Sequence, residues 1–134
     1  MNPPKIVHVI GTPNPGGVQV NLLTLLKSEA LSGFRHDIVC LIDDQGGMRR
    51  DFKAAGAEIR FCPLRWPQGR FTPSYRVDQF LRNHLYFTFP RRLASLVKKM
   101  DASLVHTHIS DRVGLQARAV LTHARRPWVW TLHG

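Results

Sequence analysis

Two glycines between a strand-like segment and a helical pattern are the first residues whose type and spacing could do chemistry. Gly16 and Gly17 follow a buried, β-branched segment and precede the apolar repeat of residues 18–32. Glycines let a ligand approach the backbone closely, and a helix N-terminus offers unpaired N–H donors and partial positive charge. The pattern therefore predicts an anion site, above all for a phosphate. The glycine spacing is not that of a dinucleotide or nucleotide loop, so a plain strand-to-helix turn remains an equal alternative.

Histidines stand at the ends of two later strand-like segments. His106 and His108 alternate along one segment and share a face of it, and His133 ends the next. Two such imidazoles can ligate a metal, with Asp111 or His133 as a third ligand. No carboxylate pair or cysteine supports that interpretation, so we expect no metal. The alternatives are histidines satisfied by hydrogen bonds, or a polar wall that contacts substrate hydroxyls near a reaction centre.

Basic and aromatic residues are concentrated in segment 65–100. It has eight Lys and Arg residues against one acidic residue, and seven of the twelve aromatic residues of a chain whose net charge is +10. This mixture suits an anionic membrane interface or single-stranded nucleic acid. A solvated basic face whose aromatic rings pack inward fits equally well. The candidate anion- or membrane-binding residues are Arg76, Arg82, Arg91, Arg92, Lys98 and Lys99.

Alternating strands and helices must position these residues. Apolar, β-branched runs predict strands at 5–10, 37–42, 58–64, 102–108 and 127–132. Helical spacing predicts helices at 18–32, 48–55 and 112–124, the last capped by Ser110 or Asp111. Within 65–100, Pro90 is expected to separate two helical pieces. The pattern indicates an α/β domain with a doubly wound, Rossmann-like parallel sheet, whose ligands bind at the carboxyl ends of the strands.

Length and composition limit what the chain can be. Its 134 residues, 43% of them hydrophobic and 21% charged, are typical of one globular domain. No apolar run is long enough for a membrane-spanning helix, and the first residues lack the order of a secretory signal. Cys40 and Cys62 lie in apolar segments, so we expect buried free thiols in a reducing cytoplasm.

Three segments, in order, resemble the N-terminal half of family 4 glycosyltransferases. They are Asn14-Pro-Gly-Gly-Val-Gln19 with the helix after it, Leu104-Val-His-Thr-His108, and Pro127-Trp-Val-Trp-Thr-Leu-His-Gly134, and the resemblance covers essentially the whole chain. It implies one half of a GT-B fold, in which residues 1–134 bind the acceptor and a C-terminal domain, absent here, holds most of the donor. It also implies a retaining hexosyltransferase that uses a UDP- or GDP-type nucleotide-sugar and no metal or other cofactor. The acceptor would be a glycan or lipid-linked molecule of envelope or exopolysaccharide synthesis.

The resemblance implies a role for each matching residue. Gly16 and Gly17 would lie against the donor diphosphate, and His133 would be the catalytic residue beside the transferred sugar. The acceptor side would be formed by Asn14, Gln19, His106 and His108. Many relatives are peripheral membrane proteins, which fits the basic segment at the inner face of a membrane. Because the chain stops at the tip of an expected strand, we expect an incomplete domain that is inactive alone.

A function of another class remains open. A non-catalytic, basic Rossmann-like module could bind anionic membrane or nucleic acid through segment 65–100. Such a module needs the basic segment but not Gly16, Gly17 and His133 together at neighbouring strand ends, and this feature distinguishes it from the glycosyltransferase. Of its two partners, nucleic acid is the weaker. A dinucleotide oxidoreductase fragment is disfavoured because the glycine spacing is wrong for it.

Overall fold

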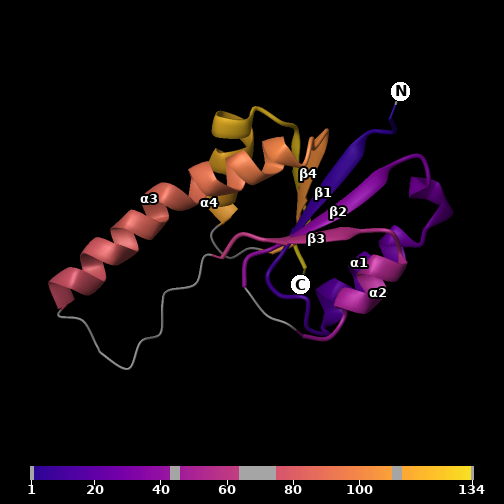
Figure 1. Ribbon diagram of the computed structural model, residues 1–134, viewed down its shortest axis with the longest axis horizontal. Coiled ribbons are helices and arrows are strands. Elements are labelled where there is room, and N and C mark those ends of the chain that lie inside the picture. Colours follow the sequence, from indigo (N-terminus) through magenta and orange to yellow (C-terminus); the bar gives the residue numbers. More distant parts are fainter. Residues whose placement is uncertain (1, 43–45, 64–74, 110–112, 134) are drawn as a thin grey trace.

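A five-stranded, fully parallel sheet forms the centre of the protein (Figure 1). The computed structural model describes residues 2–42, 46–63, 75–109 and 113–133, and only the backbone of 75–86. The strands are β1 (Lys5–Ile10), β2 (Arg35–Cys40), β3 (Glu58–Phe61), β4 (Leu104–Thr107) and β5 (Trp128–Trp130). Their spatial order is β3-β2-β1-β4-β5, so the chain builds outward from β1 in one direction and then in the other. This order confirms the predicted doubly wound sheet.

Helices cover both faces of the sheet. They are α1 (Gly17–Leu26), α2 (Arg49–Ala54), α3 (Tyr75–Lys99) and α4 (Val113–Ala117), with a short turn η1 (Glu29–Leu31) and a wider, π-type continuation of α4, η2 (Arg118–Ala124). One buried cluster joins Phe89 and Leu93 of α3 to Val7 and Val9 of β1. A second cluster joins α1 and α2 to the opposite face of β1 and β2. In Figure 1, α3 and α4 accordingly lie on one side of the sheet and α1 and α2 on the other.

Alternation along β1 decides what each face of the sheet presents. Val7 and Val9 point toward α3, so His8 and Ile10 point toward the α1 and α2 side. Burying a valine fully contributes roughly 1.5–3 kcal/mol, which makes this orientation hard to reverse. His8 is itself fully buried, so a titratable ring lies inside an otherwise apolar strand.

Pro90 does not break its segment, contrary to the sequence prediction. Helix α3 runs from Tyr75 to Lys99 with Pro90 inside it. A proline inside a helix costs about 3 kcal/mol because a hydrogen bond is lost and the ring crowds the preceding turn. Phe89, Leu93 and Val97, all fully buried, pack this part of α3 against the sheet and outweigh that cost.

The other boundaries differ from the predicted ones by a few residues. Strand β2 begins two residues early, at Arg35, and the helix expected over 18–32 ends at Leu26. The helix expected over 112–124 begins at Val113 and changes to π-type geometry at Arg118. The expected caps Ser110 and Asp111 lie outside the described residues.

The two cysteines are buried free thiols, as predicted. Burial raises the pKa of the Cys40 thiol to about 12, and it raises that of Cys62 as well. Both thiols are therefore protonated and unreactive at neutral pH. Among the described helices, none combines the length and the apolar character needed to cross a membrane.

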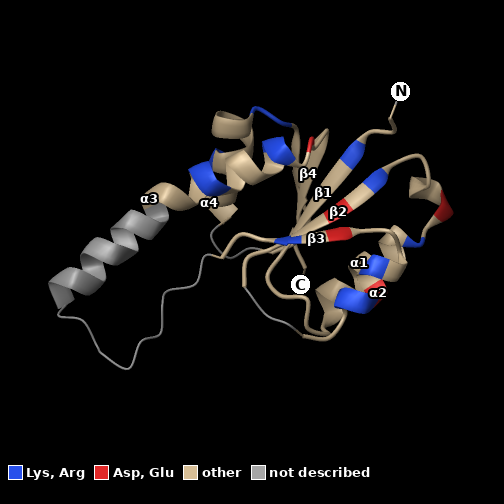
Figure 2. Cartoon of the chain, in the orientation of Figure 1, with Lys and Arg blue, Asp and Glu red and all other residues tan. Residues whose placement is uncertain are grey.

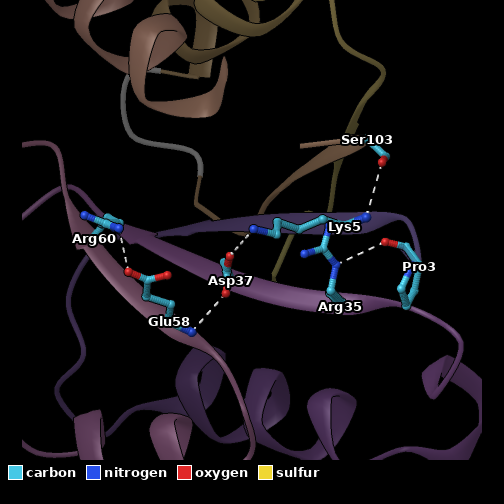
Figure 3. A network of polar contacts seen from close by, with 7 residues as sticks. All are labelled: Pro3, Lys5, Arg35, Asp37, Glu58, Arg60 and Ser103. Carbon is cyan, nitrogen blue, oxygen red and sulfur yellow. Dashed lines mark hydrogen bonds and ion pairs between the residues drawn. The ribbon is translucent and has the colours of Figure 1, made fainter. Parts of the chain in front are cut away.

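Charged groups tie the strands together at their amino ends (Figure 3). Lys5 Nζ lies 2.8 Å from Asp37 Oδ2, and the backbone N–H of Glu58 donates to Asp37 Oδ1 at 3.0 Å. The Asp37 carboxylate thus links β1, β2 and β3. Because Asp37 is nearly buried, water screens these interactions little. The pair of Glu58 and Arg60 on β3 is more than half exposed.

Replacing Asp37 by alanine is expected to lower the free energy of unfolding by about 3 kcal/mol, because the partly buried Lys5 ammonium loses its counter-charge. Glu58→Ala, which breaks only the exposed ion pair with Arg60, is expected to cost less than about 1 kcal/mol. Urea unfolding followed by circular dichroism measures both. Equal losses in the two variants would show that the Lys5–Asp37 pair is no stronger than a surface pair.

Candidate functional site

A cavity of about 280 Å³ lies at the carboxyl edge of the sheet. Its walls come from the first turn of α1 and from the chain segments that follow β4 and β5. The lining residues are Val18, His108, Ile109, Trp130, Thr131, Leu132 and His133. This is where the strand order reverses between β1 and β4, the usual ligand-binding position in such sheets. The fold thus brings the start of α1, His108 and His133 to one place.

The start of α1 is open, and no side chain of the described residues caps it. Gly16 is the N-cap in extended conformation, no side chain caps the helix, and its first turn contains no acidic residue. A Cβ atom added to Gly17 would meet nothing within 4 Å, whereas one on Gly16 would lie 2.8 Å from Gln19 Oε1. The N–H groups of this turn therefore carry a partial positive charge that no acidic residue of the turn offsets.

Gln19 and Asn14 belong to the structure of this loop. Gln19 is nearly buried, and its Nε2 donates to the Thr12 carbonyl at 2.7 Å, so it braces the loop from inside. The Asn14 backbone N–H donates to Thr12 Oγ1 at 3.2 Å. Asn14 is half-buried beside the exposed Gly16 and Gly17.

Gly47 packs against the same loop, a contact that the sequence analysis did not predict. Its φ is +36°, and a Cβ atom there would lie 2.5 Å from Pro15 Cδ. The N–H of Met48 donates to the Pro13 carbonyl at 3.0 Å. The turn after β2 thus packs against the glycine loop after β1, and the adjacent Gly46-Gly47 pair was the available signal.

A connected group of histidines continues inward from the cavity. His8 stands opposite His106 in the β1–β4 register, and His108 follows two residues later on the same face. His8 Nδ1 lies 3.0 Å from His108 Nε2, and His8 Nε2 lies 3.0 Å from His36 Nδ1. The predicted partners His106 and His108 do meet, with ring centroids 3.9 Å apart.

Two histidines of this group were missed by the sequence analysis. His8 and His36 lie in separate strands, far along the chain from His106. The available signal was a histidine inside an otherwise apolar strand. Of the proposed third ligands, Asp111 lies outside the described residues, and the His133 ring centroid is 5.8 Å from that of His108.

Burial keeps the inner imidazoles neutral. It lowers the pKa of His8 to about 2, helped by the neighbouring His108, His106 and His36. It lowers the pKa of His108 to about 3, with smaller effects of His106 and His133. The pKa of His106 is lowered too, again mainly by burial. His106 Nε2 also lies 2.6 Å from Thr131 Oγ1, a hydrogen bond from β4 to the segment after β5.

The basic residues of α3 lie away from this edge, as Figure 2 shows. Arg91, Lys98 and Lys99 are exposed, and the Arg91 guanidinium lies 5.3 Å from the ring centre of Phe87, itself 64% exposed. Arg92 is also exposed, and its Nη2 donates to the Pro63 carbonyl at 2.9 Å. The side chains of Arg76 and Arg82 lie outside the described residues.

A larger cavity of about 600 Å³ lies beside α2 and β3 and is lined in part by Arg49, Arg50 and Lys53. It does not include the residues gathered at the strand-order reversal. We therefore place the candidate site at the smaller cavity, where a helix N-terminus and neutral imidazoles meet.

Comparisons with known proteins agree with this architecture. A family model described as Glycosyltransferase Family 4 matches residues 15–134. Two crystal structures of the C-terminal domain of a hydrogenase from Pyrococcus furiosus are similar in fold. For residues 83–215 the TM-score is 0.57 at 14% identity, covering 96% of this chain and 91% of that one. For residues 78–226 it is 0.56 at 17% identity, covering 98% and 93%. At these identities the likeness shows the fold alone, and no curated protein matches the chain.

The neutral histidines predict that the protein loses stability in mild acid. The ordinary pKa of histidine is 6.5, and those of His8 and His108 in the folded protein lie far below it. At pH values between these limits, the two imidazoles take up protons only in the unfolded chain. The free energy of unfolding is therefore expected to fall with decreasing pH, by up to about 1.4 kcal/mol per pH unit for each imidazole, and to be unaffected by them above pH 7. Urea unfolding from pH 7.5 to 4.5 measures this, and His8→Gln should flatten the slope. A slope that is the same in both proteins would contradict the assignment.

Proposed function

Because the chain belongs to glycosyltransferase family 4, we propose that it is the acceptor-binding domain of a retaining hexosyltransferase. The donor is a UDP- or GDP-type nucleotide-sugar, and the acceptor is a glycan or lipid-linked molecule of envelope or exopolysaccharide synthesis. The observation that carries the proposal is the shared cavity, which joins the first turn of α1 to His108 and His133. An anion held at α1 would leave its attached sugar within this cavity.

The start of α1 is suited to the leaving diphosphate. When the sugar transfers, negative charge develops on the phosphate oxygen that leaves. The N–H groups of Gly16 and Gly17 and the positive end of α1 are fixed in place before the reaction. On this proposal they stabilise that charge, and the transfer needs no metal for it.

The histidines are suited to the sugar and the acceptor. His133 is exposed on the cavity wall, where it can position the transferring sugar as the catalytic residue. His108 is nearly buried and neutral, so it offers a fixed hydrogen-bonding group to an acceptor hydroxyl. Half-buried Asn14 and His106 stand nearby on the same edge, and Gln19 acts through the loop that it braces.

The phosphate role predicts a specific effect of Gly17→Ala. The added methyl group meets no protein atom, so the fold should be kept, but it would stand between a phosphate and the helix N–H groups. NMR titration of the chain with UDP-glucose and GDP-mannose should shift the amide signals of residues 16–18 and 133 together. Gly17→Ala should weaken that binding about tenfold, the equivalent of about 1.4 kcal/mol of hydrogen bonding.

Gly33→Ala is the matched control, because its methyl group also meets no atom and lies far from the cavity in the chain. It should leave nucleotide-sugar binding unchanged. Shifts elsewhere on the surface, or equal weakening by both variants, would contradict a phosphate site at α1.

We also propose that α3 docks the enzyme on the inner face of an anionic membrane. Its exposed Arg91, Lys98 and Lys99 accompany the exposed ring of Phe87, and basic groups with an apolar anchor favour such a surface. Arg92 is held to Pro63 and contributes less freely.

Removing three charges from α3 should release the chain from vesicles. Each basic residue near an anionic surface contributes about 1 kcal/mol, so the variant carrying Arg91→Gln, Lys98→Gln and Lys99→Gln should bind roughly 100-fold more weakly. Cosedimentation with vesicles containing phosphatidylglycerol measures this. The control carries Lys27→Gln, Arg50→Gln and Lys53→Gln, which remove the same charge from exposed positions elsewhere. Equal losses would show that net charge alone matters, and tight binding to single-stranded DNA would favour the non-catalytic alternative.

A further inference from the structure

Three imidazoles converge on one face of the sheet beside the strand-order reversal. Parallel pairing sets His8 of β1 opposite His106 of β4, and alternation puts His108 on the same face. One ring nitrogen of each can be chosen so that all three lie within 4.8 Å of one another. Sequence spacing showed only the pair on β4, whereas the fold supplies the third.

The spacing of two of these nitrogens matches that of ligands on one metal ion. Imidazole nitrogens bind Zn²⁺ at about 2.0–2.1 Å, so two of them on the same ion stand roughly 3.0–3.4 Å apart. His8 Nδ1 and His108 Nε2 are 3.0 Å apart. The His106 ring is half-buried and lies beside that of His108.

Hydrogen bonds around the group prepare His8 as a ligand. A carbonyl oxygen only accepts, so His36 Nε2 must donate to the Leu31 carbonyl, 3.3 Å away. In a neutral ring, His36 Nδ1 then accepts from His8 Nε2 at 3.0 Å. The second nitrogen of His8, Nδ1, is left with its lone pair directed at His108. Metal-binding histidines characteristically donate their other N–H in this way.

His106 has an outer partner of the same kind. Its Nε2 bonds to Thr131 Oγ1 at 2.6 Å, which leaves Nδ1 for a metal when Nε2 carries the proton. A simple hydrogen bond between His8 and His108 would account for their contact. The third imidazole, His106, packs with its ring centroid 3.9 Å from that of His108 and has its own outer partner in Thr131.

We propose that His8, His106 and His108 form a binding site for a divalent transition metal of the zinc type, with His36 and Thr131 orienting the ligands. A bound ion joins β1 to β4 at the strand-order reversal and fixes His108 in the cavity wall. In the metal-free protein, the His108 Nε2 proton bridges to His8 Nδ1, and it moves to His108 Nδ1 when the ion enters. The site shares His106 and His108 with the proposed acceptor side, but metal binding is measured without sugar transfer, so either proposal can fail without the other.

Cobalt titration tests the proposal. The chain is freed of metal with a chelator and titrated with Co²⁺ at pH 7.5, and the visible absorption of the bound ion is recorded. We expect saturation at one equivalent and displacement by Zn²⁺. His106→Gln and His108→Gln should weaken the affinity for Co²⁺ at least about 100-fold, because each removes one of three ligands, and His36→Gln about 10–100-fold through the orientation of His8.

His123→Gln is the matched control, since His123 lies on η2, outside the group. It should leave the titration unchanged, and circular dichroism should show that each variant is folded. The proposal is overturned if wild type shows no saturation at one equivalent. It is equally overturned if folded His106→Gln binds Co²⁺ as well as wild type, which would make the group a hydrogen-bonded imidazole chain only.

Discussion

Parallel pairing of β1 with β4 is the constraint on which the arrangement of the carboxyl edge depends. β1 bonds to β2 on one side and to β4 on the other. The chain leaves β1 through α1 toward one face of the sheet and leaves β4 through α4 and η2 toward the opposite face. The cavity between the glycine loop and the segments after β4 and β5 follows from that divergence. The same register sets His8 against His106. A shift of one residue would turn His8 into the α3 core and dissolve the group.

The two ends of the sheet are stabilised in different ways. At the amino ends, Asp37 gathers Lys5 and the Glu58 N–H in a charged network across three strands. Toward the carboxyl ends, the polar groups in the interior include neutral imidazoles that bond to one another and to Thr131. Neutral groups close to an open helix N-terminus leave its positive potential uncancelled. Among the described residues, the lining of the carboxyl-edge cavity contains no acidic side chain, which suits it to an anionic ligand.

Much of the fold could be predicted from the sequence, because buried parallel strands are apolar along their length and the loops between them contain glycine and proline. The prediction failed at Pro90. The tendency of proline to end a helix can be seen in the sequence, but the packing of Phe89 and Leu93 that outweighs it depends on the folded structure. The pair of His106 and His108 could be read from its spacing. His8 could not be added to this pair, because its contact with His106 and His108 depends on β1 pairing with β4 in one particular register. The contact of Gly47 with Pro15 could not be predicted for the same reason, since it joins separate loops.

The central position of β1 has a consequence for how the chain folds as it is synthesised. β1 precedes both of its neighbours along the chain, and one of them follows about 100 residues later, as the separation of His8 from His108 shows. The half formed by β1, β2 and β3 can assemble early, with one edge of β1 still unpaired. Closing so long a loop is slow, and an exposed apolar edge invites pairing with other chains. The contacts of His8 with His106 and His108 thus wait until β4 emerges, so this group is among the last parts of the fold to form.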